Sequence, residues 1–285
     1  MKVLVTGGTG YVGHFLVSAL RGDGHEVIAV SRSSTPVAMD VEDAESCARV
    51  LGDVKPDVIV HAAAQSAPAK CEEDPEAARQ SNVPRPLVEA CSRLTPALRF
   101  IFLSTDQVLS GADHLSGEAV EAAPVNVYGR TKLEMENLVR ETFSNHLILR
   151  LSFVYGPLVA GAHATFLQFA IDKLKAGKEF SAFSDQIRSC IFVDDVVALM
   201  QKAVPRNDLV GVLNLGGPEP LSRYDFCKLV AEHMEVSTDI LSGGLYSLPT
   251  PSPSDISMNV DRLSDVLGRP PLTLQAALAA NPVPK

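Results

Sequence analysis

Residues 3–13 read VLVTGGTGYVG and place Gly7, Gly10 and Gly13 three residues apart, directly after an apolar run and before a helical pattern at 12–21. In a strand, loop and helix of this kind the first glycine permits a tight turn. The second lets the backbone approach a pyrophosphate at the helix N-terminus, and the third lets the helix pack against the strand. The motif therefore predicts dinucleotide binding, and the alternative is a purely structural turn. The predicted contacts are Gly7, Thr9, Gly10, Tyr11, Val12 and Gly13.

Short β-branched runs alternate with helical patterns through the first two thirds of the chain. The expected strands are 3–5, 26–31, 57–64, 99–105 and 146–152, with a weaker one at 37–39, and the expected helices are 12–21, 43–51, 83–94 and 128–143. Continuous apolar strands joined by crossover helices are typical of a parallel sheet buried on both faces. This order predicts an α/β fold of the Rossmann type, with a doubly wound parallel sheet.

The pattern changes after Gly156. A loop is expected at 157–163, helices at 164–175 and 223–234, a late strand at 211–217 that returns to the sheet, a Pro- and Ser-rich surface loop at 245–254 and a frayed end at 281–285. We therefore expect an NAD(P)-binding domain formed by 1–156 plus about 188–217. The segments 157–187 and 218–285 would form a smaller substrate-binding region.

Composition narrows the function classes. The 285 residues are enough for one large domain, and 25 basic against 34 acidic side chains give a net charge of −9 without any basic run, which argues against nucleic-acid binding. Five cysteines without a Cys-x-x-Cys pair indicate neither a disulfide framework nor a zinc site, and hence a reducing compartment. No stretch has signal-peptide or transmembrane character, so we expect an unprocessed cytoplasmic protein without a membrane partner.

No metal site is expected from the histidines or acidic residues. The seven histidines form no His-x-x-x-His pair, and the run Cys71 to Asp74 is explained better as an acidic helix N-terminus than as metal ligands. Asp194 and Asp195 precede an apolar run and are interpreted as a helix entry.

The end of the second expected strand bears on the choice of coenzyme. It reads Ser31, Arg32 and Ser33, without the carboxylate that would bind the adenosine ribose of NAD. A guanidinium and two hydroxyls suit the 2′-phosphate of NADP, so NADP(H) is favoured over NAD(H). The alternative is that Arg32 is an ordinary solvated loop residue. Asp40 and Val41, after the third strand, would face the adenine.

Tyr128 and Lys132 stand four residues apart, on one face of an expected helix. A phenol has a pKa of about 10, and a fixed neighbouring cation would lower it toward the range useful for proton exchange. Lys132 would also reach the nicotinamide ribose. Thr105 ends the fifth strand, where open α/β sheets bind ligands, and would add a hydroxyl. The alternative makes Tyr128 a packing residue and Lys132 a surface residue.

These motifs occur together in an order that resembles the extended short-chain dehydrogenase/reductases, and the resemblance covers nearly the whole chain. The narrower similarity, carried by Ser104 to Asp106 and by Asp185 and Gln186, is to the dTDP-4-dehydrorhamnose reductases and the related regulatory β subunit of methionine adenosyltransferase. The resemblance implies roles for further residues. Thr105, Tyr128 and Lys132 would be catalytic, Ala62, Ala63, Ala64 and Asn82 would serve the cofactor, and Asp106 and Phe153 would join Thr105 at the substrate. The other motifs that carry it are 81–83 and 149–156.

The chain also departs from the rhamnose reductase pattern. Residues 107–109 read Gln-Val-Leu in place of Tyr-Val-Phe, and Phe153 stands where a Trp is usual. The stretch 252–261 lacks the Arg that would fit a nucleotide diphosphate, and no Arg occurs there before Arg262. Carboxylates in place of that arginine would repel a diphosphate. The missing arginine therefore bears on which substrate binds, and not on the catalytic residues.

The expected function is therefore an NADPH-dependent reductase of a keto group on a sugar or nucleotide sugar. A non-enzymatic NADP-binding regulatory subunit is the alternative, with a homodimer or a partner enzyme as its assembly. Epimerase or dehydratase chemistry is a third interpretation, but a dehydratase would require an acidic pair near Thr105, and Asp106 is followed by Gln107.

Overall fold

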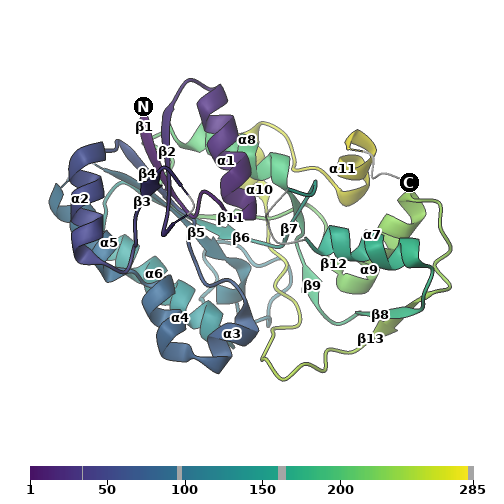
Figure 1. Ribbon diagram of the computed structural model, residues 1–285. Coiled ribbons are helices and arrows are strands. Elements are labelled where there is room, and N and C mark those ends of the chain that lie inside the picture. Colours follow the sequence, from purple (N-terminus) through teal and green to yellow (C-terminus); the bar gives the residue numbers. More distant parts are fainter. Residues whose placement is uncertain (34, 95–97, 160–164, 282–285) are drawn as a thin grey trace.

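The computed structural model describes residues 1–33, 35–94, 98–159 and 165–281. Seven parallel strands form the central sheet in the order β11-β6-β5-β4-β1-β2-β3 (Figure 1). Their bounds are β1 Lys2–Thr6, β2 Glu26–Ser31, β3 Val37–Ala38, β4 Val58–His61, β5 Arg99–Thr105, β6 His146–Leu151 and β11 Gly211–Leu215. The strand order reverses between β1 and β4, which confirms the predicted Rossmann-type fold and puts a ligand-binding crevice at the carboxyl ends of these strands.

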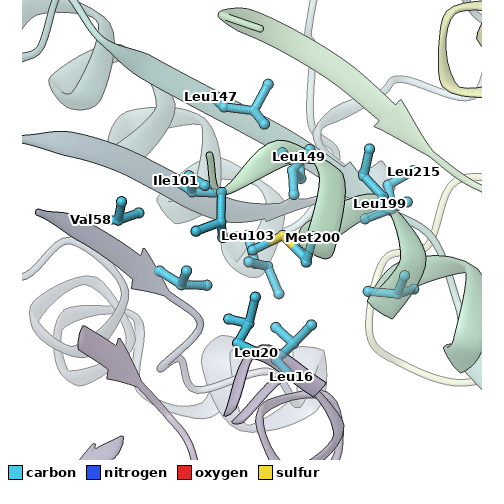
Figure 2. Packing of buried hydrophobic residues seen from close by; sticks show 14 of the residues in the cluster. Leu16, Leu20, Val58, Ile101, Leu103, Leu147, Leu149, Leu199, Met200 and Leu215 are labelled. Atoms are coloured by element: carbon cyan, nitrogen blue, oxygen red, sulfur yellow. The ribbon is translucent and has the colours of Figure 1, made fainter. Parts of the chain in front are cut away.

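Helices cover both faces of the sheet. One layer holds α2 Ala44–Val54, α5 Arg85–Leu94 and α6 Val127–Thr142, and the other holds α1 Tyr11–Gly22, α8 Val193–Ala203 and α10 Asp261–Leu267. Successive strand residues point to opposite faces. Val3 and Val5 therefore pack in the α1 and α8 layer, whereas Leu4 packs in the α2 and α5 layer. Figure 2 shows the layer of α1 and α8, in which Leu16 and Leu20 of α1 and Leu199 and Met200 of α8 belong to one hydrophobic cluster.

A second group of elements has its own hydrophobic core. It contains α7 Phe166–Ala176, α9 Arg223–His233, α11 Leu274–Ala280 and the small pairs β7 Val154–Tyr155 with β10 Ile191–Phe192, β8 Phe180–Phe183 with β13 Leu241–Gly244, and β9 Ile187–Arg188 with β12 Leu221–Ser222. These elements lie together at one end of the molecule (Figure 1). Their core is separate from the two clusters that flank the sheet.

Several expected boundaries shift. The fourth strand ends at His61 rather than at 64, and the late strand ends at Leu215. The helix expected at 83–94 begins at Arg85, and α3 Pro68–Glu73 and α4 Pro75–Asn82 precede it. Cys71 to Glu73 therefore end α3 rather than begin a helix, and Asp74 caps α4 by accepting from Ala77. The expected loop at 245–254 is confirmed, whereas 160–163 and 282–285 lie outside the described residues.

No helix within the described ranges has the length and apolar character needed to cross a bilayer. The five cysteines are all buried and free. In the same part of the chain, no group of three or more His, Cys, Asp or Glu side chains is arranged to hold a metal ion.

Candidate active site

A cleft of about 690 Å³ runs along the carboxyl ends of β1, β2, β4 and β5. It brings together most of the residues predicted for the cofactor, namely Gly7, Thr9, Gly10, Tyr11, Val12, Gly13, Ser31, Arg32, Asp40, Val41, Ala62, Ala63, Ala64, Tyr128 and Lys132. Sequence analysis assigned no role to several further lining residues, among them Glu42, Gln65, Ser66 and Ser81. Ser33, Asn82, Thr105, Asp106 and Phe153 do not line this cleft.

The glycine loop has the geometry of a phosphate cradle. Gly7 adopts a φ of +68°, and a Cβ there would lie 2.7 Å from the amide nitrogen of Ala63. A Cβ at Gly13 would overlap the Gly7 carbonyl. Gly10 is the N-cap of α1, and no side chain caps the first amides of that helix. Open amides at a helix N-terminus beside a backbone without side chains fit the pyrophosphate of a dinucleotide.

The end of the cleft beside the carboxyl end of β2 contains residues predicted to determine whether NADP or NAD binds. Arg32 is exposed and lines the cleft. The Ser31 amide donates to the Thr35 hydroxyl at 2.9 Å, which holds the turn after β2. Ser33 is exposed outside the cleft lining. The only cation that this end presents to the cleft, among the described residues, is therefore Arg32.

A hydrogen-bonded scaffold fixes the loop after β4. The Thr6 hydroxyl accepts from the amides of Ala62 and Ala63, each at 3.2 Å, and bonds Nδ1 of His61 at 2.8 Å. The Asn82 carboxamide accepts from the Gln65 amide at 2.7 Å and donates to the Gln65 carbonyl at 3.2 Å. Asn82 therefore supports the cleft wall through Gln65, which lines the cleft.

Tyr128 lies at the first turn of α6, close to the end of β5. Asn126 caps this helix by accepting from Gly129 at 2.8 Å, which sets the position of the phenol. Tyr128 packs against Cys71 and Ala78, so it is also a core residue. Burial raises the pKa of Tyr128, a hydrogen bond with Thr105 acts in the opposite direction, and the Asp106 carboxylate adds to the rise.

Lys132 is buried one turn further along α6. Its ammonium donates to the Leu103 carbonyl at 2.6 Å and lies 4.2 Å from the centroid of the Phe102 ring. The spacing of Tyr128 and Lys132 along the chain predicts that Lys132 lowers the pKa of Tyr128. In the structure burial raises that pKa, and Thr105, rather than Lys132, opposes the rise. The reason is the position of the ammonium, which is held by the end of β5.

The Asp106 carboxylate is 4 % exposed and has two hydroxyl donors. Thr105 donates at 3.2 Å and Ser152 donates at 2.8 Å. Burial raises the pKa of Asp106, and the guanidinium groups of Arg188 and Arg223 lower it, as do the two hydroxyls. These arginines come from β9 and α9, and sequence analysis missed both because nothing local marks them.

The departures from the rhamnose reductase pattern pack into two different hydrophobic clusters. Val108 and Leu109 are buried and pack with Ile256 and Met258, so they join 106–109 to the C-terminal segment. Phe153 packs in the core of the second group of elements, with Phe166 and Phe226 at ring centroid distances of 5.6 and 5.9 Å.

Comparisons with known proteins agree with this arrangement. A family model described as the RmlD substrate binding domain matches residues 1–281. The chain belongs to this family. The dTDP-4-dehydrorhamnose reductase of Escherichia coli K12 is 32 % identical over 239 residues, which cover 81 % of this chain and 78 % of that protein. The probable low-salt glycan biosynthesis reductase Agl14 of Haloferax volcanii is 28 % identical, over 98 % of this chain and 97 % of the relative.

Solved structures share the fold. The crystal structure of a dTDP-4-dehydrorhamnose reductase from Bacillus anthracis, in complex with NADP, superimposes with a TM-score of 0.87 at 21 % identity, covering 98 % of this chain and 97 % of that one. This likeness concerns the fold. Together with family membership, it confirms the expected extended short-chain dehydrogenase/reductase type.

Proposed function

We propose that this protein is an NADPH-dependent reductase that acts on a keto group of a nucleotide-linked sugar, similar to dTDP-4-dehydrorhamnose reductase. The observation that carries the proposal is the position of Tyr128, which lines the glycine-loop cleft and shares a hydrogen bond with Thr105 at the end of β5. The relatives are named as reductases, and several are named for a nucleotide-linked keto sugar. A purely regulatory role would require neither hydroxyl.

The residues that line the cleft fit NADPH. The open amides of α1 and the loop of Gly7 and Gly10 would hold the pyrophosphate, Arg32 would hold the 2′-phosphate, and Lys132 would bind the nicotinamide ribose. Asp40 and Val41 would contact the adenine. When bound, NADPH supplies the hydride for reduction of the ketone.

The hydroxyl groups of the chain would perform the proton chemistry. A raised pKa keeps the Tyr128 phenol protonated at neutral pH, which suits a group that donates a proton to the carbonyl oxygen. Thr105 would donate a hydrogen bond to the same oxygen and stabilise its developing charge. Movement of the Lys132 ammonium from the Leu103 carbonyl toward the cleft would place a cation near the phenol. This cation would stabilise the phenolate that remains after the proton is donated, and so ease the donation.

The second group of elements would bind the sugar. The coenzyme would be bound by 1–156 and about 188–217, and the substrate by 157–187 and 218–285. Asp106 and Phe153 lie where the two parts meet and would contact the substrate. A cytoplasmic location agrees with five free cysteines, since a reducing compartment keeps thiols free. For the assembly, the proposal includes either a homodimer or a complex with a partner enzyme.

The proposal is tested by NADPH oxidation in the presence of dTDP-4-dehydrorhamnose. Tyr128→Phe should bind NADPH with unchanged affinity and lose turnover by roughly 100-fold or more, because the proton donor is gone. Tyr155→Phe is the matched control, since its buried hydroxyl has no hydrogen-bond partner among the described residues. Equal rates for the Tyr128 variant and the unmodified protein would refute the proposal. No turnover by the unmodified protein, with NADPH bound, would favour the regulatory alternative.

A further inference from the structure

Arg223 is a cation beside the proposed substrate site that forms no ion pair with a carboxylate of the described residues. It is the first residue of α9, and its guanidinium lies 4.1 Å from the centroid of the Phe153 ring and 4.5 Å from that of Phe166. Its Nη1 atom is closed off from solvent and has no hydrogen-bond partner among the described residues. The aromatic rings attract the charge but accept no ordinary hydrogen bond from it.

The neighbouring Arg188, unlike Arg223, has hydrogen-bond acceptors for both of its Nη atoms. Its Nη1 and Nη2 atoms donate to five acceptors at 2.7 to 3.2 Å, which are the carbonyls of Ile187, Pro253 and Ser254, the Gln186 side chain and the Ser252 hydroxyl. These bonds hold the segment 252–254 against β9. Arg188 therefore has a structural role, and Arg223 is the arginine of the two with donors left to use.

The Asp106 carboxylate stabilises the charge of Arg223 without forming an ion pair with it. Asp106 is close enough for the guanidinium to lower its pKa, yet no ion pair joins Arg223 to any described carboxylate. Asp106 instead accepts from Ser152, the residue before Phe153. A buried N–H without an acceptor costs free energy, and a ligand that supplied the acceptor would recover it.

The geometry points to Arg223 as a substrate-specificity residue that binds an oxyanion of the sugar substrate. The oxyanion is either a phosphate of the nucleotide diphosphate or a carboxylate on the sugar, because a guanidinium fork matches both groups. This inference rests on the proposed function and extends it. The stretch 252–261 lacks the arginine that would bind a nucleotide diphosphate. Arg223 of α9, which packs on Phe153, would supply the cation in its place.

Calorimetric binding to the NADPH-saturated protein tests the inference without relying on turnover. The probes are dTDP, UDP, UDP-glucose and UDP-glucuronic acid, and the last two differ only at C6, which is a hydroxymethyl group in the first and a carboxylate in the second. In Arg223→Met, binding should weaken by roughly tenfold or more. Methionine keeps an apolar stem against Phe153 and removes the unsatisfied N–H, so folding should survive. Arg206→Met is the matched control, because this arginine is exposed and paired with Asp208 at 2.6 Å.

The pattern of losses identifies the anion. Weaker binding of all four probes assigns the diphosphate to Arg223, and a loss confined to UDP-glucuronic acid assigns a sugar carboxylate. Unchanged binding of every probe, or binding of none by the unmodified protein, would overturn the inference. Should Arg223→Met be unfolded, Arg223→Lys decides, because it keeps the charge, loses the fork and should bind several-fold more weakly. Failure of the proposed function would appear separately, as absent NADPH binding or as unaltered turnover in Tyr128→Phe.

Discussion

The ammonium of Lys132 donates to the backbone carbonyl of Leu103 at 2.6 Å, from a side chain that is only 2 % exposed. Burial lowers the pKa of Lys132 to about 7, and Glu136, one turn further along α6, acts in the opposite direction. Without a bound coenzyme, this lysine therefore changes its charge close to neutral pH. Binding of ribose hydroxyls or of an anion nearby would favour the charged form.

The Lys132 titration predicts a dependence of stability on pH. The folded protein loses this proton near pH 7, whereas the unfolded chain keeps it to about pH 10.5. Between these values the unfolded state binds more protons, so the free energy of unfolding rises with pH, by at most about 1.4 kcal/mol per unit. Urea unfolding of the coenzyme-free protein and of Lys132→Met at about pH 7.5 and about pH 9 measures this effect. The stability difference, unmodified minus variant, should increase with pH. A difference that is the same at both values would contradict the shifted pKa.

Replacing Gly13 should damage both the fold and the cleft. In Gly13→Ala the Cβ would overlap the Gly7 carbonyl and lie 2.8 Å from the Cα of Gly8, so the loop must move. We expect a loss of about 1–3 kcal/mol in unfolding free energy and a loss of NADPH affinity of roughly tenfold or more. Urea unfolding and fluorescence titration measure the two effects.

Gly22 is the matched control on the same helix. A Cβ there would meet no heavy atom within 4 Å. Gly22→Ala should therefore bind NADPH normally and gain up to about 1 kcal/mol of stability, because alanine restricts the unfolded chain and favours helix. Normal coenzyme binding by Gly13→Ala would show that the close approach of α1 to β1 is not needed.

The sequence predicts the dinucleotide half of the fold well because its signals are local. Val3, Leu4 and Val5 are buried alternately on the two faces of β1, as a central parallel strand requires. The short helices α3 and α4 escaped prediction because each has fewer than three turns and begins at a proline, Pro68 or Pro75. Proline at the first helical turn is permitted, but a short polar segment gives no apolar period to detect.

The candidate site divides in the same way. The sequence reveals two groups of cleft residues, Gly7 to Gly13 and the pair Tyr128 and Lys132. Each group is close together along the chain, and both line the cleft. A sequence motif does not reveal Arg223, because its neighbours Phe153 and Asp106 are distant in sequence and are brought to it only by folding. The direction of the Lys132 ammonium is a matter of packing too, and the i and i+4 spacing does not reveal it.

Arg32 should decide the coenzyme preference. We expect the unmodified protein to bind NADPH about 10- to 100-fold more tightly than NADH, because a guanidinium binds the 2′-phosphate through charge-assisted hydrogen bonds. Arg32→Ala should weaken NADPH binding to the level of NADH and leave NADH affinity nearly unchanged. Arg93→Ala, which removes an exposed arginine paired with Glu89, should keep the preference. Equal affinities for the two coenzymes in the unmodified protein would remove Arg32 from this role.

Glu136 should be far more important for stability than its partly buried neighbour Glu134. The Glu136 carboxylate is fully buried and accepts from the Ser104 hydroxyl at 2.6 Å and from the guanidinium groups of Arg140 and Arg150 at 2.7 to 3.2 Å. Glu136→Gln would leave the buried Arg150 without a counter-charge, so we expect a loss of about 3–5 kcal/mol in unfolding free energy.

Glu134→Gln, two residues earlier on α6, is the comparison that isolates burial. Glu134 pairs with Arg79 at 2.7 Å, and its side chain is 31 % exposed. Water compensates both partners there, so the change should cost about 1 kcal/mol or less. Urea unfolding of the two variants gives both values under one condition. If Glu136→Gln costs no more than Glu134→Gln, then the buried carboxylate does not stabilise the junction of β5, β6 and α6.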